Sequence, residues 1–210
     1  DAHVYQPTPK AARSVAEADV LFMNGLEFEG WLERLAEAAS FDGSMVVATT
    51  GVVPIAFEEH EDDDHDDHEE HDDHDDHDDH DDHAGHDHGT FDPHAWQSLD
   101  NAVIYANNIA AGLAQADPAN ASAYYTNRAA FVTEIVALKS DIDAMMAALP
   151  ADKRTVVTPH DAFGYFAEAY NLTFEAPQGM STESEVSAAD VAALITQIRR
   201  ESISAVFIES

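Results

Sequence analysis

The apolar positions of the chain follow two different spacings, which separate expected strands from expected helices. Residues 20–23 and 45–48 are short, continuous apolar runs, which predict buried strands. Between them, residues 27–39 carry apolar side chains three or four positions apart, as one face of a helix does. Thr8-Pro9 predicts the start of an earlier helix, with Thr8 as its N-cap. Strands that are apolar on both faces and alternate with helices predict a parallel sheet covered by helices.

The second half of the chain begins with a long helical pattern and then returns to the alternation. Residues 98–149 are helical in pattern with one break, at Asp117-Pro118, and the part after the break is long for a globular helix, whose mean length is about 11–12 residues. The later elements are expected strands at 155–158, near 173–174 and at 205–209, and expected helices at about 162–170 and 187–201. We therefore expect an α/β protein of two small parallel-sheet lobes joined by a long rigid helix, with the ligand site in the crevice between the lobes.

The expected domain boundaries follow from these elements. The N-terminal lobe takes residues 1–57 and 89–117, the linker helix takes 118–149, and the C-terminal lobe takes 150–210. Residues 58–88 interrupt the first lobe with a composition of their own. The chain begins in what reads as the middle of a loop and ends in what reads as a strand, so we expect a fragment in which both lobes are incomplete.

The interrupting segment, residues 58–88, is called the His tract below. It contains ten His and nineteen Asp or Glu residues and neither Lys nor Arg, and from His65 to His86 a His recurs at every third position. Such a segment cannot bury enough apolar surface to offset the entropy of ordering it, so we expect a disordered, solvated loop. Its imidazoles and carboxylates predict that it binds divalent cations.

Charge and composition exclude several classes of function. The formal net charge is −33, and the nineteen acids of the His tract contribute −19 of it. Nucleic acid is not expected as a partner, because binding its phosphates requires a basic surface. The chain has no Cys, which rules out disulfides, thiolate zinc sites and a Cys nucleophile. No apolar run approaches the roughly 20 residues that a membrane-spanning helix needs.

Three His residues lie outside the His tract: His3, His94 and His160, each in a turn-like sequence beside Pro or acidic residues. His160 comes directly after an expected strand, at the end of a parallel sheet where ligands bind. Each residue, taken alone, is also explained as a solvent-exposed His near a helix start or a chain end. Taken together, beside a segment that collects cations, the three indicate where a metal ion is held.

Several stretches resemble the zinc-binding solute-binding proteins of bacterial ABC importers, a metal-specific group that also includes manganese binders. These stretches are, besides the His tract, residues 1–9 (DAHVYQPTP), 24–32 (NGLEFEGWL), 92–96 (DPHAW), 158–166 (TPHDAFGYF) and 178–187 (QGMSTESEVS). They extend over nearly the whole chain in the family's order, and the His tract is typical of the zinc branch.

The resemblance implies which residues hold the metal. His3 and His94 would be ligands from the first lobe, and His160 a ligand from the second. The family's fourth ligand, usually an Asp, would lie after Ser210, so the fourth position is left open between that Asp, Glu27 and a water molecule.

Two further positions affect the choice of metal. Gly179 or a neighbour stands where manganese binders have a ligand Glu, which leaves a site rich in imidazole. Three nitrogen ligands suit Zn²⁺, whereas Mn²⁺ prefers oxygen. Glu209, at the end of the last expected strand, is a candidate hydrogen-bond acceptor for a ligand His.

We therefore expect a monomeric, periplasmic protein that captures a zinc ion, performs no covalent reaction and delivers the ion to the membrane permease of an ABC importer. A periplasmic metallochaperone that loads it is a further candidate partner. Two alternatives remain. One is a zinc storage or chaperone protein that acts through the His tract, and the other is a zinc hydrolase with three His ligands and an open water position, for which no suitably placed general base stands out.

Overall fold

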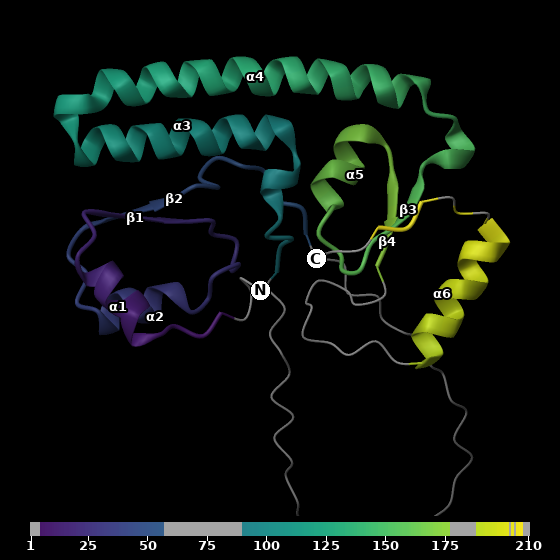
Figure 1. Cartoon of the computed structure of the whole chain (residues 1–210), viewed down its shortest axis with the longest axis horizontal. Coiled ribbons are helices and arrows are strands. Elements are labelled where there is room, and N and C mark those ends of the chain that lie inside the picture. The colour runs from purple at the N-terminus through teal and green to yellow at the C-terminus, as the bar shows by residue number, and fades with distance from the viewer. Residues whose placement is uncertain (1–4, 57–89, 177–187, 202, 204, 208–210) are drawn as a thin grey trace, which may run out of the picture.

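The computed structural model describes residues 5–56, 90–176, 188–201, 203 and 205–207, and Figure 1 shows their arrangement. His3, the His tract with its expected disorder, Gly179 and Glu209 lie outside the described residues. The helices are α1 (Pro9–Ala16), α2 (Leu32–Ala38), α3 (Leu99–Ala116), α4 (Ala121–Ala148), α5 (Gly164–Tyr170) and α6 (Ala188–Glu201), with short 3₁₀ turns η1 (Ala95–Gln97), η2 (Pro118–Asn120) and η3 (Ala151–Lys153). The strands are β1 (Val20–Met23), β2 (Ser44–Val47), β3 (Thr155–Val157) and β4 (Thr173–Glu175).

The first lobe is built on the parallel pair β1 and β2, in which Val20 lies opposite Ser44. Helix α1 starts as expected, because Pro9 occupies its first turn and the Thr8 hydroxyl accepts a hydrogen bond from the Ala11 N–H at 3.2 Å. The buried core of the first lobe consists of Val15, Leu32, Leu35 and Ala36. The parallel pairing predicted for this region is confirmed.

The second helix of this lobe is shorter than predicted, since α2 begins at Leu32 and not near residue 27. Gly25, Leu26 and Glu27 have φ angles of 88°, 54° and 62°, which a right-handed helix cannot contain. The Glu29 carboxylate accepts hydrogen bonds from the N–H groups of Asn24 and Gly25 at 2.6 and 3.2 Å. The first residues of the predicted helix therefore form a turn after β1, although their apolar side chains have helical spacing.

Helices α3 and α4 form an antiparallel pair, and the break between them falls where the sequence predicted it. Ser98 caps α3, and the chain breaks at Asp117, whose carboxylate accepts hydrogen bonds from Asn120 and Tyr124 at 2.6 and 2.8 Å. Helix α4 has 28 residues and extends over both lobes in Figure 1. Among the described residues of α4, Ile135 is the buried one.

The second lobe contains the parallel pair β3 and β4, with Thr155 opposite Thr173. Of the strand expected at residues 205–209, the described residues form a parallel bridge in which Val206 lies opposite Val157. The Arg154 guanidinium donates to the carbonyls of Met146 and Tyr170 at 2.7 and 3.0 Å, which attaches the end of α4 to this lobe.

The two lobes lie side by side beneath α4 (Figure 1), and α5 of the second lobe packs against η1 at the edge of the first. The predicted α/β architecture, with two small parallel-sheet lobes joined by a long helix, is confirmed. None of the helices in the described ranges is long and apolar enough to cross a membrane.

Candidate metal site

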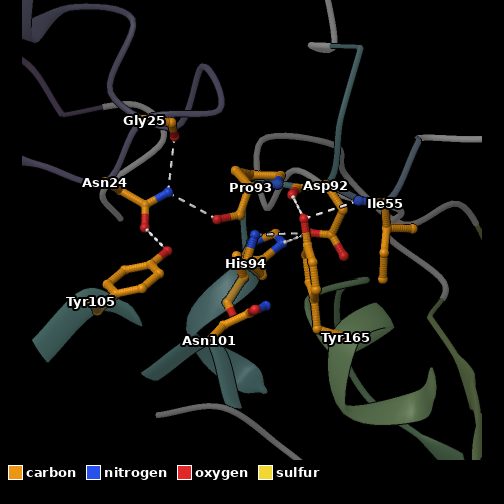
Figure 2. Close-up of polar contacts among 10 residues, drawn as sticks. Asn24, Gly25, Ile55, Asp92, Pro93, His94, Asn101, Tyr105 and Tyr165 are labelled. Atoms are coloured by element: carbon orange, nitrogen blue, oxygen red, sulfur yellow. Dashed lines mark hydrogen bonds and ion pairs between the residues drawn. The ribbon is translucent and has the colours of Figure 1, made fainter. Parts of the chain in front are cut away.

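His94 is held at the edge of the first lobe by a turn that begins at Asp92. The Asp92 Oδ1 atom accepts a hydrogen bond from the His94 backbone N–H at 2.8 Å and lies 2.8 Å from His94 Nδ1 (Figure 2). Both side chains are buried, and His94 is only 2% exposed. A carboxylate that accepts the Nδ1 proton selects the tautomer whose Nε2 lone pair can bind a metal ion.

His160 approaches from the second lobe, three residues after the end of β3 at Val157. Its backbone carbonyl accepts a hydrogen bond from the Thr158 hydroxyl at 3.1 Å, and the residue is 9% exposed. The centroid of its ring lies 5.6 Å from that of His94. The structure thus brings together two of the three predicted ligands, one from each lobe, and their interpretation as solvent-exposed residues is wrong.

The remaining candidates do not join this pair in the described part of the chain. His3 lies outside the described residues. Glu27 is exposed, and its carboxylate accepts a hydrogen bond from the Thr90 N–H at 3.1 Å. No group of three or more His, Asp or Glu side chains among the described residues is arranged to hold a metal ion, so Glu27 does not lie with His94 and His160.

Aromatic rings surround His94 on the side of the first lobe. The centroid of the Trp96 ring lies 5.3 Å from that of His94, and the Phe28 ring lies 6.0 Å from His94 and 5.0 Å from Trp96, all with edge-to-face geometry. Such a shell limits the access of water and lowers the local dielectric constant, which strengthens charge interactions at the site. Sequence reasoning placed Phe28 on a helix face; its occurrence in one of the resembling stretches was the signal for a role at the site.

A second set of hydrogen bonds supports the turn before His94. The Asn24 side-chain amide donates to the carbonyls of Gly25 and Pro93, each at 2.9 Å, and its oxygen accepts from the Tyr105 hydroxyl (Figure 2). Burial raises the pKa of Tyr105 well above its ordinary value, and Tyr165 and nearby carboxylates add to the shift. Tyr105 therefore stays protonated and remains a donor at neutral pH.

Tyr165 contacts the same turn from the second lobe. Its hydroxyl donates to the Asp92 carbonyl at 2.9 Å and accepts from the Ile55 N–H at 3.1 Å. Burial raises the pKa of this hydroxyl as well, so it too is protonated at neutral pH. Sequence reasoning missed Tyr165, Tyr105 and Asn24, although Tyr165 and Asn24 occur in resembling stretches.

Comparison with known proteins places this arrangement in a family. The family described as zinc-uptake complex component A, periplasmic (ZnuA), matches residues 1–210. The iron-binding protein YfeA of Yersinia pestis is 31% identical over 208 residues, which cover 99% of this chain and 58% of that protein. A manganese ABC transporter substrate-binding lipoprotein of Streptococcus gordonii is 27% identical over 215 residues, covering 100% of this chain and 62% of the relative.

A solved structure gives the same result for the fold. The periplasmic zinc-binding protein TroA of Treponema pallidum superimposes with a TM-score of 0.80 at 25% identity, covering 100% of this chain and 66% of that one. The chain thus spans about three fifths of the length of the curated relatives it matches. This family consists of solute-binding proteins of ABC importers and not of enzymes. The chain belongs to the zinc-uptake component A family of periplasmic metal-binding proteins.

Proposed function

We propose that this protein captures a divalent transition-metal ion in the periplasm and delivers it to the membrane permease of an ABC importer, without performing a covalent reaction. The observation that carries the proposal is the buried pair of His94 and His160, whose ring centroids lie 5.6 Å apart. Each ligand comes from a different lobe, so an ion between them would join the lobes. The Asp92 carboxylate on His94 is the kind of partner that metal-binding imidazoles usually have.

We further propose Zn²⁺ as the ion. The relatives are named for iron, manganese and zinc, so the choice rests on the residues of this chain. Imidazole nitrogens suit Zn²⁺ better than Mn²⁺. His3 is proposed as the third ligand, and the fourth position is proposed for an oxygen from Glu27, from water or from an Asp after Ser210. Of these, Glu27 requires a rearrangement, because its carboxylate binds the Thr90 N–H.

The His tract is proposed to collect zinc weakly near the tight site. In this scheme it is a loop at residues 58–88 between the two parts of the N-terminal lobe, 1–57 and 89–117, with 118–149 as linker helix and 150–210 as the C-terminal lobe. We propose a monomer, with a periplasmic metallochaperone as a candidate donor of the ion. The rival function, zinc storage, assigns all binding to the His tract.

Substitution of the two His residues tests the proposal. His94→Ala or His160→Ala should weaken zinc binding by at least roughly a hundredfold, because loss of a ligand costs more than the 10–100-fold typical of an outer-shell partner. Affinity is measured by titration against a competing chelator. His74→Ala, within the His tract, is the matched control and should leave the tight affinity unchanged. Tight binding that survives in both site variants would assign the metal to other residues.

A further inference from the structure

Tyr165 joins the two lobes at the residue that orients a proposed metal ligand. Its side chain belongs to α5 of the second lobe, and its hydroxyl bonds to the backbone of two first-lobe residues, Ile55 and Asp92. The residue is only 4% exposed. The bond to the Asp92 carbonyl is buried and the bond from the Ile55 N–H is partly buried, so the loss of the hydroxyl would leave a buried acceptor and a partly buried donor without this partner.

The two residues that Tyr165 binds are also paired with each other, through the backbone groups that the hydroxyl does not contact. The Asp92 N–H donates to the Ile55 carbonyl at 2.9 Å, and the adjacent residues Ala56 and Phe91 form an antiparallel bridge. The hydroxyl closes the end of this short ladder by accepting from Ile55 and donating to Asp92. The second lobe thus fixes the position of Asp92 relative to the rest of the first lobe.

A second contact from α5 falls on the carboxylate of Asp92. Gly164 packs so closely that a Cβ atom at this position would lie 2.6 Å from Asp92 Oδ2. The other carboxylate oxygen, Oδ1, holds the His94 ring at Nδ1. Adjacent residues of α5 therefore lie against the carbonyl and the carboxylate of Asp92, whose carboxylate binds the His94 ring.

We propose that Tyr165 is a positioning residue for metal affinity, which couples the approach of the second lobe to the orientation of His94. This inference rests on the proposed role of His94 and His160 as ligands. With its two hydrogen bonds in place, the turn at Asp92 and the strand end that carries His160 are held in register before the ion arrives. Without them, only a fraction of molecules has both imidazoles aligned, and the apparent dissociation constant rises as that fraction falls.

The experiment compares two tyrosines of the same helix in the full chain. Tyr165→Phe keeps the ring and removes the hydroxyl. Tyr170→Phe is the matched control, because Tyr170 is 5% exposed and its hydroxyl has no hydrogen-bond partner within the described structure. The probe is Zn²⁺, and the readouts are its release rate into an excess of chelator, its affinity by competition, and the melting temperature of the metal-free protein.

We expect Tyr165→Phe to release zinc about tenfold faster and to bind it correspondingly more weakly, since outer-shell partners typically contribute 10–100-fold. Tyr170→Phe should stay close to the unsubstituted protein in both readouts. A purely structural role would lower the melting temperature of the metal-free protein and leave the release rate unchanged. That result would overturn the inference.

A second pair of variants tests the same contact independently, in case Tyr165→Phe does not fold. Gly164→Ala places a methyl group against Asp92 Oδ2 and should also speed zinc release. Gly30→Ala is its control, since a Cβ there has no neighbour within 4 Å among the described residues. If His94→Ala still binds zinc tightly, the proposed site itself is wrong. If His94→Ala loses zinc but Tyr165→Phe and Gly164→Ala both release it at the normal rate, the inference about α5 alone is wrong.

Discussion

His94 and His160 lie next to each other, but the described contacts that position them differ in kind. His94 follows a turn that is held by the Asp92 side chain, two residues before it, and by Asn24 and Tyr165, which come from distant parts of the chain. His160 follows β3 directly, and the hydrogen bond on its carbonyl comes from Thr158, two residues away. The described hydrogen bonds at the turn before His94 thus include contacts from distant parts of the chain, whereas the one on the His160 carbonyl is local.

The exposed fractions agree with this difference. His94 is 2% exposed and has Phe28 and Trp96 beside its ring, whereas His160 is 9% exposed. A buried ligand that is oriented in advance loses little conformational freedom when it binds an ion. His94 is thus the more deeply buried of the two imidazoles, and His160 completes the pair from the second lobe.

The largest difference between the two ligands is expected in zinc affinity when the carboxylate that orients His94 is removed. Asp92→Asn keeps the size of the side chain but replaces the carboxylate on His94 Nδ1 by a neutral amide, and zinc affinity should fall by about 10–100-fold. Thr158→Val, which removes the hydrogen bond to the His160 carbonyl, is the matching change in the second lobe and should cost less than about threefold, the effect of a bond worth roughly 0.5 kcal/mol. Competition titration measures both. Equal losses in the two variants would show that the two ligands are held alike.

An intermediate effect is expected from alkaline pH, because the network around His94 contains the partly buried Tyr105 and the buried Tyr165. The pKa of Tyr105 is raised in the folded protein, mainly by burial. The folded state therefore retains a proton that the unfolded chain loses, and this contribution to stability is complete below about pH 10 and lost as the pH rises further. Urea unfolding between pH 9 and 11 should show a falling free energy of unfolding.

The control for this experiment is a tyrosine far from the network. Tyr105→Phe should flatten the decline above pH 10, whereas Tyr125→Phe, at an exposed position of α4, should not. A decline that is equally steep in both variants would mean that Tyr105 contributes little to the pH dependence.

The smallest effect on the tight site is expected from deletion of residues 58–88. Ala56 and Phe91 already pair on either side of this segment, and the entropy of closing a loop changes only slowly with its length. The tight affinity should change by less than about twofold, while weak zinc equivalents disappear. Isothermal titration of the deleted protein measures both. If tight binding is lost as well, zinc storage by the His tract becomes the better account.

The fold was largely predictable because its determinants are local. Apolar runs marked β1 and β2, Thr8-Pro9 marked the start of α1, and Asp117-Pro118 marked the break between α3 and α4. The start of α2 was not predictable in this way. Three successive residues with positive φ, from Gly25 to Glu27, depend on contacts such as those of the Glu29 carboxylate with the Asn24 and Gly25 N–H groups.

The metal site likewise has features that the sequence specifies and features that only the tertiary structure specifies. His94 and His160 were identifiable from the sequence, because imidazoles are few outside the His tract and stand in turn-like surroundings. Only the tertiary structure decided that their rings lie together, and that Tyr165 binds Ile55 and Asp92 across 110 and 73 positions of the chain. Residue type and spacing specify which atoms can bind a metal ion. Which of them meet depends on how the two lobes pack, and no local pattern encodes that.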